Sequence, residues 1–247
     1  VSTVAIKALL TDLDLKQGFD LRIKKNIAAG SGLGSSASSA AAAVYAVNEI
    51  LGRPKSQLEL INYAMIGEKL ASTKAHADNV APSVLGGFTA VRSYEPLDVF
   101  NISYPESLKV VVIFPQIEIK TSDAKKILRD EVKLTDAVKQ LGNMAGLISG
   151  LIEHDFERIG KSLQDVIVEP VRSILIPFYH QMKTLALEKG ALGLSISGSG
   201  PSMFCFIKEA GASDEIIDAA RALYGTHEIE VISFVSGINK QGAKIIE

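Results

Sequence analysis

The residues best suited to chemistry lie in a glycine-rich segment that reads AGSGLGSSASS from Ala29 to Ser39. Gly30, Gly32 and Gly34 free the backbone to adopt positive φ angles and leave its N–H groups uncovered. The alanines and serines that follow predict a helix, and the first turn of a helix offers unpaired N–H groups and the positive end of a dipole. The segment therefore predicts a cradle for the phosphates of a nucleotide.

Regular elements are expected on both sides of this loop. Phe19, Leu21 and Ile23 alternate with polar residues, which is the period of a strand, and a helix is expected over about 36–51. These flanks disfavour a flexible Gly/Ser linker. Two familiar phosphate loops do not match, because no lysine follows Gly34 as a Walker A loop requires and the G-x-G-x-G spacing differs from the dinucleotide fingerprint.

The composition narrows the class of protein. The chain has 247 residues, of which 47% are hydrophobic and 22% charged, and its net charge is −2. This length suits one large domain or two small ones, and without a basic stripe we expect no nucleic-acid partner. No apolar run approaches the roughly 20 residues of a membrane span, and the histidines lack metal-ligand spacing. Cys205 lies in an apolar run, which predicts a buried thiol. A single cysteine allows no disulfide within the chain, which is typical of a reducing cytosol and predicts a cytoplasmic protein.

The rest of the pattern predicts an α+β protein. A capping box of Ser56 and Glu59 begins a second helix, and a loop is expected over 76–83. The likeliest boundary separates a domain over 1–105 from one over 106–247. Strands are expected at about 88–93, 108–114, 192–197, 202–207 and 228–236, and helices at about 123–129, 135–152, 155–166, 173–189 and 213–224.

Phosphoryl transfer needs positioned reactants, magnesium and charge stabilisation, and several side chains could supply them. Ser36, at the start of the helix, and Glu68, beside an apolar stripe, are candidate magnesium ligands. The alternative for Glu68 alone is a solvated surface charge. Asp78 and Asn79 could hold a substrate ammonium or accept a hydroxyl proton, or they could form an Asx turn.

Two further segments bear on the same chemistry. The sequence SGSGP from Ser197 to Pro201 is either an ordinary tight turn or a second glycine-rich wall against the first loop, and two such loops favour one shared anion site. Arg172, in the segment DVIVEPVR, could bind a substrate acid group in bidentate fashion. The alternative is a surface arginine in a salt bridge.

Taken in this order, these segments resemble the GHMP small-molecule kinases, and within them the branch that acts on homoserine. The second motif of the family corresponds to AAGSGLGSSA over 28–37, and the third to SISGSGP over 195–201. Segments more specific to the branch are HADNVAP over 76–82, QLGNMAG over 140–146 and EPVR over 169–172. The resemblance covers essentially the whole chain.

The resemblance implies an N-terminal domain like ribosomal protein S5, a ferredoxin-like C-terminal domain, and the use of ATP and Mg²⁺. The implied reaction transfers the γ-phosphate of ATP to the hydroxyl of L-homoserine in threonine biosynthesis. It implies small-molecule substrates, neither a nucleic acid nor a membrane as partner, and a homodimer. The alternatives are another GHMP kinase, for mevalonate, shikimate or a sugar, and a non-catalytic nucleotide-binding relative.

The resemblance also implies roles for individual residues. Whether Asp78 acts as a base or only positions the substrate stays open, since a carboxylate that holds an ammonium is poorly placed to take a hydroxyl proton. The implied roles are ATP binding by Gly30, Ser31, Gly32, Leu33, Gly34, Ser35, Ser36, Gly198 and Gly200; magnesium binding by Ser36 and Glu68; catalysis by Asp78, Asn79 and Thr121; and substrate binding by Asp78, Asn79, Lys125 and Arg172.

The chain departs from the family pattern in three places. Ala28 stands where the motif has a proline, which loosens the entry to the loop. Lys125 stands where the family has an arginine that clamps the carboxylate, so the charge is kept and the fork is lost. The first family motif would precede Val1, and without it we expect the chain as given to bind nucleotide weakly or not to turn over.

Overall fold

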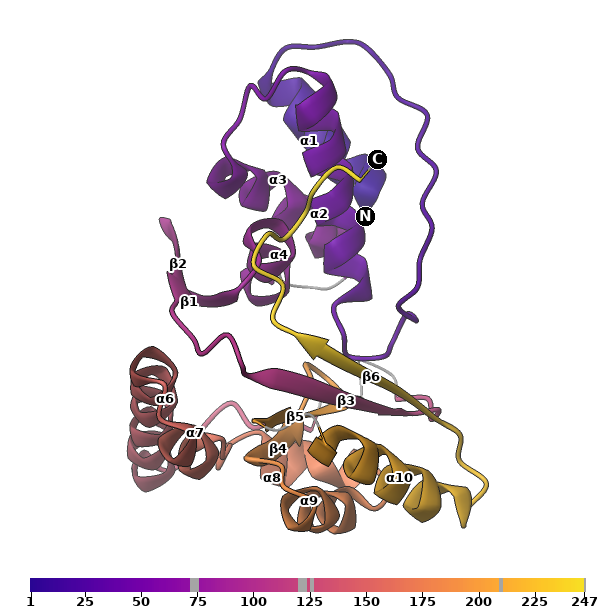
Figure 1. The fold of residues 1–247 in the computed structure, drawn as a ribbon. Coiled ribbons are helices and arrows are strands. Elements are labelled where there is room, and N and C mark those ends of the chain that lie inside the picture. Colours follow the sequence, from indigo (N-terminus) through magenta and orange to yellow (C-terminus); the bar gives the residue numbers. More distant parts are fainter. Residues whose placement is uncertain (72–75, 120–123, 125–126, 209–210, 247) are drawn as a thin grey trace. The chain divides into compact units, whose positions relative to one another are not determined.

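The computed structural model describes residues 1–71, 76–119, 124, 127–208 and 211–246 (Figure 1). The chain divides into two compact units. The first unit holds residues 1–29, 34–102 and the segment from Asn239 onward, and the second holds residues 30–33 and 103–238. The glycine-rich loop thus groups with the second unit, while the helix that follows it belongs to the first.

The described residues of the first unit form four helices and one hairpin of strands. An apolar cluster joins the helices, and small side chains such as Ala37, Ala40 and Ala41 line its centre, so the helices can pack closely. The elements are α1 (Ser2–Asp12), α2 (Ser35–Ile50), α3 (Gln57–Ala71) and α4 (Ala77–Leu85), with β1 (Phe88–Tyr94) antiparallel to β2 (Leu97–Ile102).

Local signals correctly predicted α2 and the start of α3. The helix expected over 36–51 is α2, and the capping box of α3 is confirmed. The backbone N–H of Ser56 donates to the Glu59 carboxylate at 2.8 Å, and the N–H of Glu59 donates to the Ser56 hydroxyl at 3.3 Å. Each side chain therefore satisfies a donor at the start of α3.

The strand expected around 19–24 is wrong, because residues 15–26 form no regular element. Leu21 and Ile23 are 41% and 48% exposed. Alternation makes a strand only where a neighbouring strand takes up the backbone hydrogen bonds, and none of the described strands pairs with this segment.

The loop expected over 76–83 is also wrong, because these residues form most of α4. Ala77, Val80, Ala81 and Val84 are fully buried and lie at helical spacing, so packing of one face stabilises the helix. Pro82 and Asn79 are typical of loops, and they masked this period. The proline lies inside the helix, where it removes one backbone N–H donor.

The second unit contains an antiparallel sheet in the order β4-β5-β3-β6. Helices α9 and α10 cover one face of it (Figure 1), and Cys205 is fully buried in that core as predicted. The elements are β3 (Lys109–Pro115), α6 (Leu134–Glu153), α7 (Phe156–Ser162), α8 (Glu169–Arg172), the 3₁₀ turn η1 (Ser173–Leu175), α9 (Tyr179–Glu188), β4 (Gly193–Ile196), β5 (Met203–Ile207), α10 (Gly211–Gly225) and β6 (Val231–Gly237).

The α+β class is confirmed, with one helix prediction in need of correction. The single helix expected over 173–189 is instead η1 followed by α9, which begins just after Pro177. Proline supplies no N–H for a helical hydrogen bond, so the break falls there. Of the helix expected over 123–129, residues 123, 125 and 126 lie outside the described residues, and residues 127–129 form no helix.

The C-terminal segment packs against the end of α4 within the first unit. The N–H of Gly87 donates to the Asn239 carbonyl at 2.7 Å, and the N–H of Ala243 donates to the Val84 carbonyl at 3.3 Å. A Cβ added at Gly242 would lie 2.3 Å from the Val84 carbonyl oxygen, so the two backbones are in direct contact. This contact anchors the helix that carries Asp78.

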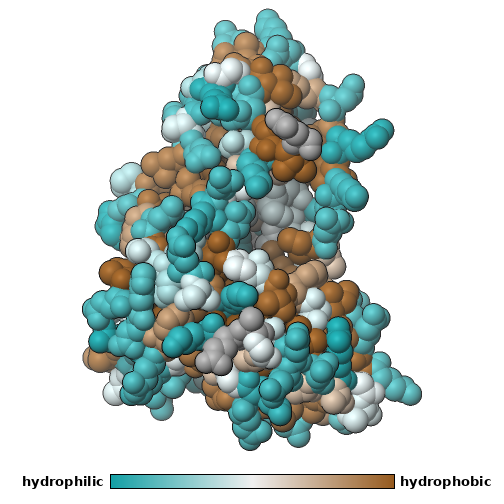
Figure 2. Space-filling view, in the orientation of Figure 1, coloured by the Kyte–Doolittle hydropathy of each residue, from teal (hydrophilic) through white to brown (hydrophobic). Residues whose placement is uncertain are grey.

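The surface carries hydrophilic residues among small hydrophobic patches on the face shown in Figure 2. Over the described part of the chain, no helix has the length and apolar character that a bilayer crossing requires.

Candidate active site

The glycine-rich loop has the backbone conformation that its sequence predicts. Gly30, Gly32 and Gly34 adopt φ angles of 77°, 81° and 69°, a left-handed region that glycine enters without a steric penalty. Gly34 is also the N-cap of α2, and it offers no capping side chain. The first N–H groups of α2 therefore depend on another acceptor, which an anion can supply.

The second glycine-rich segment lies against the first. The Ser197 hydroxyl donates to the Gly32 carbonyl at 2.9 Å, and the N–H of Ser202 donates to the Ser31 carbonyl at 3.2 Å. A Cβ on Gly32 would lie 2.4 Å from the Ser197 carbonyl oxygen. The segment is also a tight turn, since the N–H of Gly200 donates to the Ser197 carbonyl at 2.9 Å. Both interpretations of SGSGP thus hold, and the shared anion site stays a prediction.

The serines at the start of α2 differ in what their hydroxyls do. Ser35 donates to the Ile27 carbonyl at 2.8 Å, and Ser38 donates to the Ser35 carbonyl at 3.1 Å. The Ser36 Oγ is buried, and no partner for it occurs among the described residues. Since a buried hydroxyl without a partner is costly, Ser36 is the serine of this turn that a ligand would satisfy.

Glu68 lies on α3 and is only 8% exposed, so the interpretation as a solvated surface charge is wrong. A buried carboxylate and a buried hydroxyl are oxygen donors of the kind magnesium takes. Among the described residues, no group of three or more His, Cys, Asp or Glu side chains is arranged to hold a metal ion. Magnesium at a nucleotide needs only one or two protein oxygens besides the phosphates, so Ser36 and Glu68 fit such an ion.

Asp78 and Asn79 lie in the first turn of α4, so the Asx-turn alternative is wrong. The Asn79 Oδ1 lies 3.6 Å from a Cβ built on Gly34, which brings Asn79 beside the start of α2. The Asp78 side chain is 61% exposed, and its Oδ1 lies 3.6 Å from the His76 Nδ1. The Tyr94 hydroxyl donates to the same oxygen at 3.5 Å. Burial, and then the Asp78 charge, raise the pKa of Tyr94.

Arg172 is the last residue of α8, and its guanidinium bonds only to carbonyls among the described residues. Its Nη1 donates to the Gly198 carbonyl at 2.8 Å, and its Nε donates to the Ala124 carbonyl at 3.3 Å. Burial lowers the pKa of the guanidinium. The salt-bridge alternative finds no carboxylate within ion-pair distance in the described part of the chain, although the Asp165 charge acts on the guanidinium and opposes the effect of burial on its pKa. A partly desolvated guanidinium favours a ligand carboxylate.

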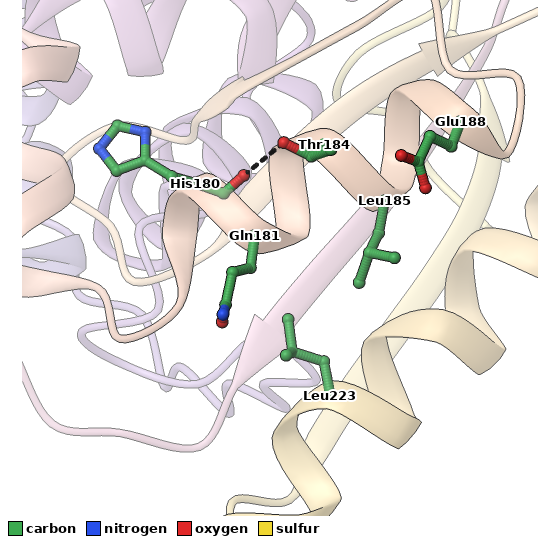
Figure 3. A pocket seen from close by; sticks show the side chains of 6 residues that line it. All are labelled: His180, Gln181, Thr184, Leu185, Glu188 and Leu223. Atoms are coloured by element: carbon green, nitrogen blue, oxygen red, sulfur yellow. Dashed lines mark hydrogen bonds between the residues drawn. The ribbon is translucent and has the colours of Figure 1, made fainter.

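A separate pocket in the second unit lies away from the residues that the sequence singled out. It measures about 470 Å³, and its lining combines apolar and polar side chains (Figure 3). It holds no predicted site residue, so we assign it no part in the reaction. Its lining residues are His180, Gln181, Thr184, Leu185 and Glu188 of α9 and Leu223 of α10.

The chain is similar to known proteins over most of its length. The family described as GHMP kinases N terminal domain matches residues 2–87, and GHMP kinases C terminal matches residues 147–226. A homoserine kinase of Chlorobium phaeobacteroides is 44% identical over 236 residues, which make up 95% of this chain and 74% of that protein. The chain belongs to the GHMP kinases.

Further relatives of this GHMP kinase agree. A homoserine kinase of Methanococcus maripaludis is 39% identical over 85% of the chain and 69% of that protein. The crystal structure of homoserine kinase from Cytophaga hutchinsonii matches with a TM-score of 0.96 and 45% identity, over 99% of this chain and 78% of that one. Mevalonate kinase from L. major matches with a TM-score of 0.70 at 15% identity, over 98% and 77%, and this likeness shows the fold alone. The expected GHMP kinase fold is confirmed.

The individual site residues of this GHMP kinase remain predictions. Thr121 and Lys125 lie outside the described residues. Tyr94, whose hydroxyl donates to Asp78, lies outside every predicted motif, and the hydroxyl of Ser197, which donates to the Gly32 carbonyl, has no predicted role. Glu169, which is buried at the start of α8, was also missed. The only available signal was the position of Ser197 and Glu169 inside motifs.

Proposed function

We propose that this GHMP kinase is a homoserine kinase, which transfers the γ-phosphate of ATP to the hydroxyl of L-homoserine and yields O-phospho-L-homoserine and ADP. The observation that carries the proposal is the 44% identity to a homoserine kinase over 95% of the chain. The surroundings of Arg172 support it independently, because a guanidinium without a described carboxylate partner suits an amino-acid substrate.

In this proposal the glycine-rich loop and the first turn of α2 hold the phosphates of ATP. Backbone N–H groups around Gly32 and Gly34 donate to phosphate oxygens, and the dipole of α2 adds positive potential. The contact with Ser197 holds the loop in its left-handed conformation. Ser36 and Glu68 would hold Mg²⁺, which neutralises charge on the phosphates when it is bound.

The other end of the substrate is assigned to charged and polar side chains. Arg172 binds the carboxylate of homoserine, and Lys125 adds a second positive charge. Asp78 and Asn79, in the first turn of α4, bind the ammonium and hydroxyl groups. The Asp78 carboxylate has the His76 Nδ1 at 3.6 Å and the Tyr94 hydroxyl at 3.5 Å as neighbours. A carboxylate that holds an ammonium is poorly placed to take a hydroxyl proton, which supports positioning of the substrate over proton abstraction.

The acidic alternative substrates lack one group that homoserine carries. Mevalonate and shikimate also combine a carboxylate with a hydroxyl, but neither carries an ammonium for Asp78 to bind. We further infer that the protein acts in the cytoplasm and that it forms a homodimer, as the resemblance implies. Light scattering at several protein concentrations tests the homodimer.

Coupled ADP release tests the proposal on the chain as given and on a version that carries the first family motif before Val1. Reactions contain MgATP and L-homoserine, mevalonate or shikimate in parallel. The proposal predicts turnover that depends on homoserine and is much weaker with the other two acids. Turnover with mevalonate or shikimate alone would move the assignment to another GHMP kinase. A folded protein that binds nucleotide and turns over no acceptor would support the non-catalytic relative.

A further inference from the structure

A buried carboxylate joins three elements beside Arg172. Glu169, the first residue of α8, is 8% exposed. Its Oε1 accepts a short hydrogen bond from the Lys183 Nζ on α9, and the Ser195 hydroxyl on β4 donates to its Oε2 at 3.3 Å. Glu169 therefore fixes α8 to α9 and to the sheet of the second unit at once.

The helix that Glu169 begins cannot hold its own geometry. α8 is four residues long, from Glu169 to Arg172, and a helix of one turn has too few internal hydrogen bonds to be stable alone. Arg172 lies three residues after Glu169, on the same turn. The direction in which the guanidinium leaves the backbone thus depends on what anchors α8 from outside.

Further side chains hold the segment that leads into α8. The N–H of Val166 donates to the Gln140 Oε1 at 3.0 Å, and the Asn143 Nδ2 donates to the Gln164 carbonyl at 2.9 Å. The Asp165 Oδ1 accepts from the N–H of Val168 at 2.8 Å. These bonds fix the backbone before α8, and Glu169 anchors the first residue of α8 itself.

Stability alone is a weak reason to bury this ion pair. The desolvation of two charges offsets much of their attraction, and apolar residues of similar size are often as stable. The neighbouring Tyr179 stays neutral, because burial and then the Glu169 charge raise the pKa of its hydroxyl. The buried carboxylate instead fixes the orientation of α8, since it accepts hydrogen bonds from donors on α9 and β4.

We propose that Glu169 is a positioning residue for Arg172. Its bonds from Lys183 and Ser195 fix α8, and α8 then presents the guanidinium to the substrate carboxylate in one orientation. The inference rests on the proposed function, in which that carboxylate belongs to homoserine. Glu169 would not contact the substrate itself. It would act only on the recognition of the substrate carboxylate, through Arg172.

The test compares two acceptors that differ only in that group, L-homoserine and 3-aminopropan-1-ol, which lacks the carboxylate. The Glu169→Gln variant keeps the shape of the side chain and removes its charge. We expect kcat/KM for L-homoserine to fall about tenfold, mainly through KM. The values for 3-aminopropan-1-ol and the KM for ATP should stay within about twofold of wild type.

Two controls separate positioning from general damage. Glu215→Gln removes a surface carboxylate of the same unit that pairs with Lys189 at 3.4 Å, and it should leave both acceptors unchanged. In an Arg172→Ala background, Glu169→Gln should cause no further loss with L-homoserine, because residues that act through one another are not additive. If Glu169→Gln does not fold, Ser195→Ala removes one bond to Glu169 and should lower the homoserine value about threefold by the same route.

Equal losses with both acceptors would overturn the inference, since they would mark a merely structural role. Unchanged homoserine kinetics in a folded Glu169→Gln protein would also overturn it and would leave the proposed function intact. If the wild-type protein shows no turnover that depends on homoserine, the proposed function fails first and this inference fails with it.

Discussion

The hydroxyl of Ser197 donates a hydrogen bond to the carbonyl of Gly32, 165 positions earlier in the chain, at 2.9 Å. This bond joins two glycine-rich turns, one before α2 and one between β4 and β5. Both turns are rich in glycine, whose backbone is conformationally free, so the bond between them restricts the conformation of each. A loop that must offer its N–H groups to phosphate oxygens is thereby held ready before the ligand arrives.

Gly32→Ala should weaken ATP binding much more than Gly30→Ala. Both residues have a left-handed φ, but a Cβ at position 32 would lie 2.4 Å from the Ser197 carbonyl oxygen, whereas nothing lies within 4 Å of a Cβ at position 30. Both variants place an alanine at a positive φ and so carry backbone strain, but only Gly32→Ala also produces a steric clash. We expect the KM for ATP to rise at least about tenfold in Gly32→Ala and about threefold in Gly30→Ala. Equal effects in steady-state kinetics would contradict the packing argument.

Ser36→Ala should raise the magnesium concentration that gives half-maximal rate by about tenfold at fixed ATP. The physical reason is that the buried Ser36 Oγ has no partner among the described residues and is free to bind an ion. Ser38→Ala is the matched control, because the Ser38 hydroxyl already donates to the Ser35 carbonyl. Activity should vanish in EDTA and return with added Mg²⁺. An unchanged magnesium dependence in Ser36→Ala would show that Ser36 does not bind the ion.

Gly242→Ala should detach the C-terminal segment from α4. The added Cβ would lie 2.3 Å from the Val84 carbonyl oxygen, and the φ of Gly242 is +58°. We therefore expect the free energy of unfolding to fall by about 1–3 kcal/mol. Hydrogen exchange of the Gly87 and Ala243 amides, which bond across this contact, should become faster. Gly18→Ala, which has open space and no positive φ, should leave exchange at both amides unaltered. Protection that survives in Gly242→Ala would show that the contact is dispensable.

The free energy of unfolding should fall as the pH rises above 8.5. Burial raises the pKa of the Cys205 thiol to about 12, whereas an unfolded cysteine titrates near 8.5. Between these values the unfolded chain binds fewer protons than the folded one, so stability declines with pH. From pH 7.5 to 9.5 the thiol accounts for a loss of about 1.4 kcal/mol.

Cys205→Ala isolates the thiol in that experiment. Burial also raises the pKa of Tyr179 and Tyr224, which adds a loss of the same sign at higher pH and remains in the variant. Urea denaturation at pH 7.5 and 9.5 should therefore show a smaller decline for Cys205→Ala than for wild type. Identical declines would show that the thiol is not protected by burial.

Local signals made α2 and the capping box of α3 predictable, because glycines, small helix formers and the Ser56–Glu59 pair act over a few residues. The segment around Leu21 alternates like a strand, but whether it forms one depends on a neighbouring strand that the local sequence does not reveal. For α4, the burial of Val80 and Val84 outweighed the loop character of Pro82. Packing partners of this kind lie far away in the chain.

The candidate site likewise has one part that local sequence predicts and another that depends on the tertiary fold. Glycine spacing revealed the loop, and the conformations of Gly30, Gly32 and Gly34 confirm it. A single charged residue gives no sign of its environment, so neither the burial of Glu68 nor the ion pair of Glu169 with Lys183 could be predicted. Both depend on side chains that only the tertiary fold brings together.

The most direct test of the central claim is detection of the product itself. Phosphorus NMR of the full-length protein with MgATP and L-homoserine should show O-phospho-L-homoserine and ADP forming in equal amounts. Asp78→Ala should reduce this rate by at least about a hundredfold, whereas Asp136→Asn, which alters an acidic residue in the first turn of α6, should match wild type. ADP that forms without the phosphoester, or a product rate unaffected by Asp78→Ala, would contradict the account.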